Sequence, residues 1–301
     1  IGYFQKNYCE ISKYSIVGET LKIISNSSKS KENFDTQILK MYDRQLGFIK
    51  EDDFVGIKNL HIAIVGCGGI GSPLAVMLAK MGVKKISLFD DDKIEIHNLP
   101  RIYGADESDI GKFKTEVLKD HINSFSNCEV KTYNIRVDEN IADFYNCDVI
   151  YGCLDNYQAR STLNKFSYTL ATPYIDAGCA IPLDEDTIIN AATSVTVVMP
   201  TKACLWCADI INGMKIREES LTTEEHSRQV DEGYIQGVNS VPSVISLTTA
   251  VASAAANRLF NILGIYNSKI PMRTVYDFNF DKKFDYHYDK KEKCFCTRSP
   301  I

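Results

Sequence analysis

The chain has 301 residues with 39 acidic and 34 basic side chains, and its net charge of −5 argues against nucleic acid as a main partner. A hydrophobic content of 45% is enough for one large or two medium domains. No apolar run reaches the length of a membrane span, so we expect no membrane partner. The ten cysteines are scattered along the chain, which favours the reducing cytoplasm over a secreted, disulfide-bonded class.

The first 40 residues differ in sequence pattern from the rest of the chain. Strands are predicted over 8–17 and 21–24, and the polar run over 26–33 has no apolar period and reads as a linker. The first residue is isoleucine, so we expect the sequence to be a fragment. We assign residues 1–40 to a small appended module or its remnant.

A glycine-rich turn follows the first strong strand pattern. A strand is predicted over 60–66, a helix over 70–82 and a second strand over 84–90, which ends at Asp90. The order strand, G-x-G-x-x-G, helix, strand, acid is typical of nucleotide-binding sites, because glycines admit a phosphate to the backbone and the acid accepts from ribose hydroxyls. The glycines concerned are Gly66, Gly68, Gly69 and Gly71. Alone, this pattern would suggest NAD.

Polar and cationic residues beyond the strand ends change that interpretation. Asn98, Arg101 and Lys114 follow the second strand, and several such groups suit a triphosphate better than a diphosphate bridge. Asp155 ends a later strand, predicted over 147–154, and a carboxylate there can hold Mg²⁺ against phosphates. The sequence therefore predicts ATP and Mg²⁺ as ligands.

The alternation of elements predicts an α/β fold with a Rossmann-like, doubly wound, mostly parallel sheet. The elements are helices over 36–46, 70–82, 114–125 and 156–170, and strands over 60–66, 84–90, 129–137, 147–154 and 173–177. Antiparallel strands are predicted after Pro182, over 187–198 and 273–287, with a long helix over 250–263 between them.

Two cysteine pairs lie far apart in the sequence. Cys204 and Cys207 form a Cys-x-x-Cys, and Cys294 and Cys296 form a Cys-x-Cys near the C-terminus. Four thiolates suit one tetrahedral Zn²⁺, which would tether the C-terminal tail. A disulfide or free surface thiols are the alternatives.

The motifs occur together in the order of the ThiF/MoeB/HesA superfamily, the prokaryotic relatives of ubiquitin-activating enzymes, and the chain resembles this family over about residues 41–301. The motifs are Tyr42-Asp43-Arg44-Gln45, the glycine turn, Asp90 through Arg101, Gly111-Lys112-Phe113-Lys114 and Asp155-Asn156. The resemblance implies an ATP-binding adenylation domain over 41–301, with residues 1–40 as an extension or the remnant of a small peptide-binding module. The chain departs from the family in one place: relatives carry Cys-x-x-Cys twice, whereas the second pair here is Cys-x-Cys.

The resemblance implies a role for each site residue. Arg44 would reach the triphosphate in the partner subunit of a homodimer. Arg44, Arg101, Lys114 and Asp155 would act in catalysis, with Asp155 on Mg²⁺. The nucleotide would be bound by Gly66, Gly68, Gly69, Gly71, Asp90, Asp92, Asn98, Arg101, Lys114, Asp155 and Asn156.

The implied reaction is adenylation of the C-terminal carboxylate of a peptide or small protein. The extension favours an MccB-type peptide-modifying enzyme, and so does the absence of cysteine between Cys207 and Cys294 on the expected crossover loop at 208–236. A MoeB/ThiF-type activator of a ubiquitin-like sulfur carrier is the alternative. A Rossmann oxidoreductase binding NAD is more remote, and so is an inactive scaffold that binds protein tails.

Overall fold

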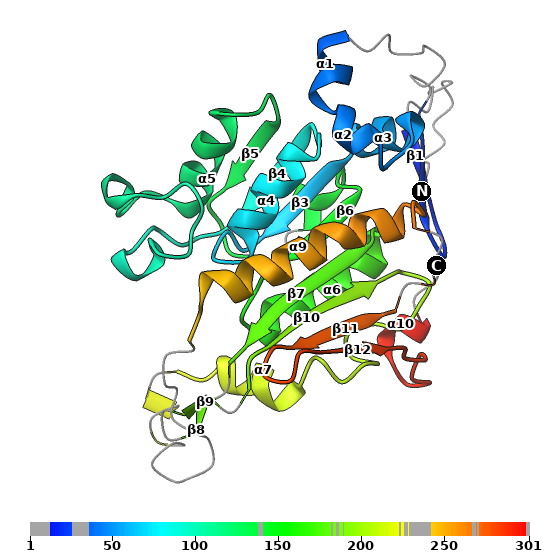
Figure 1. The fold of residues 1–301 in the computed structure, drawn as a ribbon. Helices are drawn as coiled ribbons and strands as arrows, with labels where there is room; N and C mark the ends of the chain where they lie inside the picture. Colours follow the sequence, from blue (N-terminus) through cyan, green and yellow to red (C-terminus); the bar gives the residue numbers. More distant parts are fainter. Residues whose placement is uncertain are drawn as a thin grey trace.

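An eight-stranded mixed sheet organises the molecule (Figure 1), in the order β12-β11-β10-β7-β6-β3-β4-β5. The computed structural model describes residues 13–25, 36–137, 141–181, 183–184, 187–188, 190–222, 224–225, 228, 242–266, 269 and 271–298. The strands of this sheet are β3 (His61–Val65), β4 (Lys85–Phe89), β5 (Glu129–Tyr133), β6 (Val149–Gly152), β7 (Tyr174–Ala180), β10 (Ala192–Val198), β11 (Arg273–Asp277) and β12 (Lys282–Tyr286).

Five of these strands are parallel and reverse their order once. The chain runs from β3 outward to β4 and β5, and then returns to place β6 and β7 on the other side of β3. This is a doubly wound order, and its switch point lies between β3 and β6, where such sheets bind ligands. Beyond β7, the strands β10, β11 and β12 pair antiparallel. The predicted fold class is confirmed.

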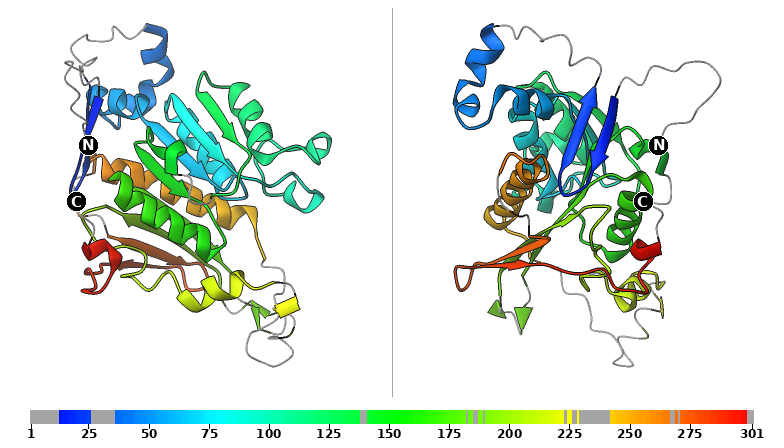
Figure 2. Two further views of the ribbon diagram at one scale, coloured as in Figure 1. Left: turned by 180° about the vertical axis from the view of Figure 1, so that it is seen from behind. Right: turned by 90° about the vertical axis from the view of Figure 1, so that its right-hand side faces the viewer.

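Helices cover both faces of the sheet. On one face α4 (Gly71–Lys80), α5 (Lys114–Asn123) and α9 (Ile245–Ile262) share one buried cluster, and on the other α6 (Tyr157–Leu170) packs with a second cluster (Figure 2). All five residues of β3 are buried, because a parallel strand covered on both faces is apolar throughout. No helix among the described residues is long and apolar enough to cross a membrane.

The remaining elements are short. They are β1 (Lys13–Val17), β2 (Leu21–Ser25), α1 (Thr36–Met41), α2 (Asp43–Leu46), α3 (Glu51–Lys58), β8 (Leu183–Asp184), β9 (Thr187–Ile188), α7 (Gly213–Glu219) and α10 (Phe295–Arg298), with 3-10 turns at Ile96–Asn98, Glu107–Asp109 and Ile141–Phe144. Strands β1 and β2 form an antiparallel hairpin.

This hairpin packs against the end of the sheet at which the parallel strands begin. Leu21 is 2% exposed and joins the larger core cluster. Lys13 Nζ lies 2.6 Å from Asp148 Oδ2, just before β6. Of the predicted N-terminal module, residues 1–12 and 26–35 lie outside the described residues.

Several boundaries differ from the prediction for local reasons. The helix predicted over 36–46 is interrupted at Tyr42, whose ψ of 13° leaves the helical range and whose ring packs on Phe54 at 4.7 Å between centroids. No element is predicted for 51–58, where α3 buries only Phe54, Ile57 and the stem of Lys58. The segment expected to be an open loop over 208–236 contains α7, and residues 223, 226–227 and 229–236 of it lie outside the described residues.

Candidate active site

The glycine turn joins β3 to α4 at the switch point. Gly66 has a φ of +89°, and its N–H donates to the Phe89 carbonyl at 2.8 Å. A Cβ at Gly66 would lie 2.4 Å from the Cys153 carbonyl oxygen, and one at Gly71 would lie 1.8 Å from the Gly66 carbonyl oxygen. These two glycines are therefore required by the fold itself. A Cβ at Gly68 meets nothing within 4 Å, so the turn is open there.

Asp90 ties the glycine turn to the end of β4. One carboxylate oxygen accepts from the Cys67 N–H at 2.6 Å and the other from the Asp92 N–H at 2.9 Å. Burial raises the pKa of Asp90, while the charge of Lys114 and the two backbone donors lower it. The carboxylate is thus held rigidly at the strand end, where the sequence predicts ribose binding.

Lys114 begins α5 and reaches the same strand end. Its residue is 9% exposed, and its ammonium donates to Asp92 Oδ2 at 2.7 Å. Its backbone N–H also donates to the Asp92 carbonyl at 3.1 Å, so two contacts fix the start of the helix. The structure therefore places Asp92 as the counterion of Lys114, beside Asp90.

Asn98 and Arg101 lie on a short turn against the glycine turn. Asn98 is 3% exposed, and its side-chain oxygen accepts from the Glu95 N–H at 3.2 Å, which closes a capping box. The Arg101 N–H donates to the Asn98 carbonyl at 3.0 Å, so Asn98 shapes the turn that presents Arg101. Arg101 Cδ lies 3.5 Å from where a Gly69 Cβ would be, and Thr248 of α9 lies 3.4 Å from the same point.

Asp155 and Asn156 lie between β6 and α6, next to the glycine turn. The Cys153 N–H donates to the Val65 carbonyl at 2.8 Å, which joins this loop to β3. Asn156 Oδ1 accepts from the Ala159 N–H at 2.8 Å and caps α6. Asp155 is exposed and makes no hydrogen bond or ion pair with any other residue that the structure describes.

A buried ion pair joins α6, the helix that follows this loop, to β7. Arg160 Nε donates to Asp176 Oδ1 at 2.9 Å, and its Nη2 lies 2.5 Å from Oδ2. Tyr174 Oη donates to Asp176 Oδ1 at 2.8 Å. Asp176 is 1% exposed and lies inside β7 opposite Gly152.

Arg44 lies near the end of α4 that is far from the glycine turn. Its neighbour Gln45 donates from Nε2 to the Met81 carbonyl at 2.8 Å, and Met81 directly follows α4. The glycine turn precedes α4, and a helix of that length spans about 15 Å. Arg44 is exposed and lines a surface hollow with Phe48 and three other residues. The structure does not bring Arg44 to the glycine turn of its own chain.

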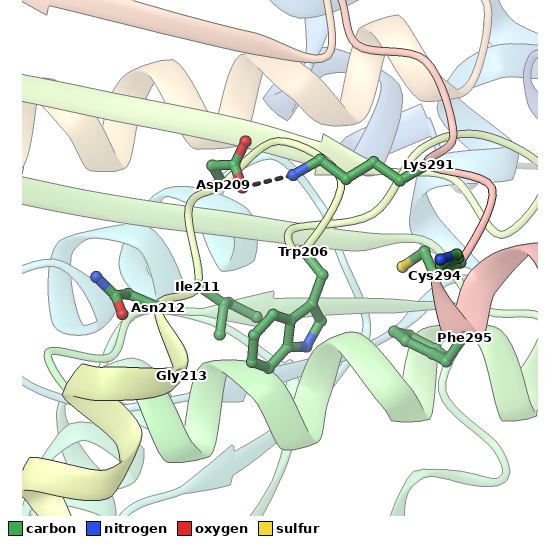
Figure 3. A pocket seen from close by; sticks show the side chains of 9 residues that line it. Trp206, Asp209, Ile211, Asn212, Gly213, Lys291, Cys294 and Phe295 are labelled. Atoms are coloured by element: carbon green, nitrogen blue, oxygen red, sulfur yellow. Dashed lines mark hydrogen bonds and ion pairs between the residues drawn. The ribbon is translucent and has the colours of Figure 1, made fainter.

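The four cysteines of the two pairs lie close together in the fold. Their sulfur atoms all lie within 4.8 Å of one another, and the Sγ–Sγ distances are 3.8 Å for Cys204–Cys207 and 3.4 Å for both Cys204–Cys294 and Cys207–Cys296. Tetrahedral zinc with bonds of about 2.3 Å separates its thiolates by about 3.8 Å, so the set fits a zinc ion. A pocket lined by Trp206, Asp209 and Phe295 opens beside it (Figure 3).

The residues at the switch point also fit the predicted nucleotide. The turn is open at Gly68, the half-buried carboxylate of Asp90 and the buried ammonium of Lys114 lie at the end of β4, and Arg101 flanks Gly69. Asp155 is exposed and uncommitted to any described partner, which suits a Mg²⁺ ligand. Sequence patterns gave no signal for Thr248, which reaches the turn from α9, or for the pairing of Asp176 with Arg160, sixteen residues away.

Comparisons with known proteins agree with this architecture. Ubiquitin-like modifier-activating enzyme 5 of Dictyostelium discoideum is 29% identical over 198 residues, covering 60% of this chain and 49% of that protein. The enzyme of the same name from Aedes aegypti is 27% identical over 315 residues, covering 96% and 76%. This chain spans about half the length of several such relatives.

A solved structure shares the fold. The crystal structure of E. coli MccB with MccA-N7isoASN has a TM-score of 0.67 and 21% identity, and the match covers 90% of this chain and 76% of that one. At this identity the likeness is one of fold. The ThiF family model matches residues 42–296, which is most of the chain. The chain therefore belongs to the ThiF family.

Proposed function

We propose that this protein is an ATP-dependent adenylyltransferase that activates the C-terminal carboxylate of a peptide or small protein. A carboxylate oxygen of the substrate bonds to the α-phosphorus of ATP, and the bond from that phosphorus to the β-phosphate oxygen breaks. The products are acyl-AMP and pyrophosphate. The observation that carries the proposal is the meeting of Asp90, Lys114 and Arg101 around an open glycine turn at the switch point of a ThiF-family sheet.

The chain's part in this reaction is positioning and charge neutralisation, because the substrate carboxylate is itself the nucleophile. Asp90 accepts from the ribose hydroxyls, and the backbone of the glycine turn borders the phosphates. Lys114 and Arg101 neutralise phosphate charge, with Arg44 supplied by a partner subunit. Magnesium held by Asp155 would supply further neutralisation of the phosphates.

Two kinds of substrate fit this chemistry. We favour a short peptide, as in MccB-type enzymes, and the support is the shared fold and the lack of any cysteine between Cys207 and Cys294 to accept an acyl group. The alternative, a ubiquitin-like protein, is supported by the names of the sequence relatives. We also infer a cytoplasmic location, because the nine cysteines in the described part of the chain form no disulfide.

Two measurements test the proposal. Calorimetry should show binding of ATP with Mg²⁺ and no comparable binding of NAD, since an oxidoreductase would show the reverse. Pyrophosphate should exchange into ATP when a substrate with a free C-terminal carboxylate is added, and not when the same substrate is amidated there. The panel should hold short peptides encoded beside the gene and ubiquitin-like proteins ending in Gly-Gly. Binding of NAD but not ATP would refute the proposal.

A further inference from the structure

The start of helix α6 is capped by a residue from a distant part of the chain. Glu219, the last residue of α7, accepts from the Tyr157 N–H through Oε1 at 2.7 Å and from the Gln158 N–H through Oε2 at 2.9 Å. Asn156 takes the next donor, Ala159 N–H, at 2.8 Å. The first four N–H groups of a helix, counted from the N-cap, have no partner within it, and these bonds satisfy three of the four in α6.

These two hydrogen bonds are stronger than those of a cap formed by an uncharged side chain. A carboxylate that accepts two N–H groups forms charge-assisted hydrogen bonds, and the helix dipole favours a negative charge there. The partners are 62 and 61 residues apart in the chain, so the contact is a tertiary one. Ile216 of the same helix packs on the second core cluster and fixes α7 in place.

The capped end carries Asp155, the proposed magnesium ligand. Asp155 lies two residues before Tyr157, in a loop whose other end is held to β3 by the bond from Cys153 N–H to the Val65 carbonyl. The loop is thus fixed at one end by the sheet and at the other by the capped helix. Asp155 itself has no described partner, so the position of its backbone, and with it that of its carboxylate, depends on these two anchors.

We propose that Glu219 is a positioning residue that holds the Asp155 loop in the geometry needed to bind magnesium and nucleotide together. Its role in metal binding rests on the proposed function, whereas the contact itself can be tested without it. Glu218 is the matched control, because it lies on the same helix and its carboxylate pairs with Lys215 at 2.8 Å, away from the start of α6.

Hydrogen exchange tests the contact first. In Glu219→Ala the amides of Tyr157 and Gln158 should exchange at least about tenfold faster, because a hydrogen-bonded amide becomes exposed to water. Glu218→Ala should leave both rates unchanged. In Glu219→Gln one carbonyl oxygen remains as acceptor, so one of the two amides should stay protected.

The magnesium dependence of ATP binding then tests the role. The half-saturating Mg²⁺ concentration should rise on the order of tenfold in Glu219→Ala, less in Glu219→Gln and not in Glu218→Ala, with all three variants still folded at the assay temperature. Faster amide exchange with unchanged magnesium dependence would reduce Glu219 to a helix cap and overturn the proposal. Failure of the wild-type protein to bind ATP would instead overturn the proposed function, and this role with it.

Discussion

At the scale of single residues, the site depends on one half-buried carboxylate, that of Asp90, with several partners. Burial raises the pKa of Asp90, and Lys114 and the N–H groups of Cys67 and Asp92 act against that rise. The four groups come from three different segments that meet at the end of β4. Replacing one of these groups therefore changes the hydrogen bonds and the electrostatic surroundings of the others.

We predict that Lys114→Ala weakens ATP binding by on the order of tenfold to a hundredfold. The loss follows from removal of charge-assisted hydrogen bonds to phosphate, which contribute about 1.5–3 kcal/mol each. Lys112→Ala is the matched control, since Lys112 is more exposed and pairs with Asp109 at 2.8 Å. Calorimetry with ATP and Mg²⁺ measures both variants. Equal weakening in both would point to general surface charge instead of a site contact.

We predict that His61 makes stability depend on pH. Burial lowers the pKa of His61, whose ring lies 2.9 Å from the Asn146 carbonyl through Nδ1 and 2.8 Å from Ser87 Oγ through Nε2. A carbonyl only accepts, so Nδ1 donates and the neutral ring accepts from Ser87. The unfolded chain takes up a proton near pH 6.5 and the folded chain only at lower pH, so stability is lost as pH falls below about 6.5.

The test compares wild type with His61→Gln by urea unfolding. Between pH 7.5 and 5.5 the free energy of unfolding should fall less in the variant, because it lacks this titration. Between pH 7.5 and 8.5 the two should change in parallel, since His61 is neutral in both states there. An identical fall on the acid side would show that His61 is not responsible.

At the scale of elements, the cysteine cluster joins the turn after β10 to the C-terminal tail. Cys204, Cys207 and Cys296 are buried, although the tail hairpin β11–β12 next to them is largely exposed. The Lys291 N–H donates to Cys207 Sγ at 3.3 Å, which supports a thiolate at that position. Tyr288 of the tail packs against the second core cluster and Phe295 packs on Tyr168, so the four sulfurs add to an apolar attachment.

We predict about one zinc per purified chain, from the four-thiolate rule. Replacing Cys294 and Cys296 together by serine should remove the zinc and lower the melting temperature, because metal binding is coupled to folding of the tail. Cys179→Ser is the control, as Cys179 lies on β7 outside the cluster. Metal analysis and thermal unfolding measure the result. Unchanged zinc content in the double variant would mean that the ion is held elsewhere.

At the scale of the whole molecule, the position of Arg44 favours a homodimer. The residue lies past the far end of α4 from the glycine turn, so it can serve a nucleotide site only in another subunit. Met41 and Phe48 nearby are 75% and 59% exposed, and such apolar side chains are typical of a surface that packs against a partner. A two-fold axis would bring each Arg44 to the opposite site.

We predict that inactive variants restore each other's activity. Arg44→Ala and Lys114→Ala chains should each be nearly inactive alone, as each lacks a phosphate contact at both sites. After subunits exchange in an equal mixture, activity should reach about a quarter of the wild-type rate, because half of the dimers are mixed and each has one intact site. Pyrophosphate exchange measures the recovery. Confirmed subunit exchange without recovery would place Arg44 outside the site.

The sequence by itself determined the doubly wound fold, the glycine turn and the cysteine set. These signals are local or periodic: β3 is apolar throughout because both faces are covered, and Gly66 and Gly71 are glycines because a Cβ would collide with backbone. Spacing alone also paired the cysteines, which the fold brings within 4.8 Å. The roles assigned to Asp92, Asn156 and the other site residues remain predictions.

Only the tertiary structure decided which distant groups meet. Glu219 caps α6 from 62 residues away, Thr248 reaches the glycine turn from α9, and Asp176 pairs with Arg160 inside a strand. Tertiary structure also placed Arg44 beyond the reach of its own glycine turn. The physical reason is common to these cases: a lone carboxylate, hydroxyl or guanidinium in a sequence carries no periodic signal, and its role depends on what the sheet and helices bring beside it.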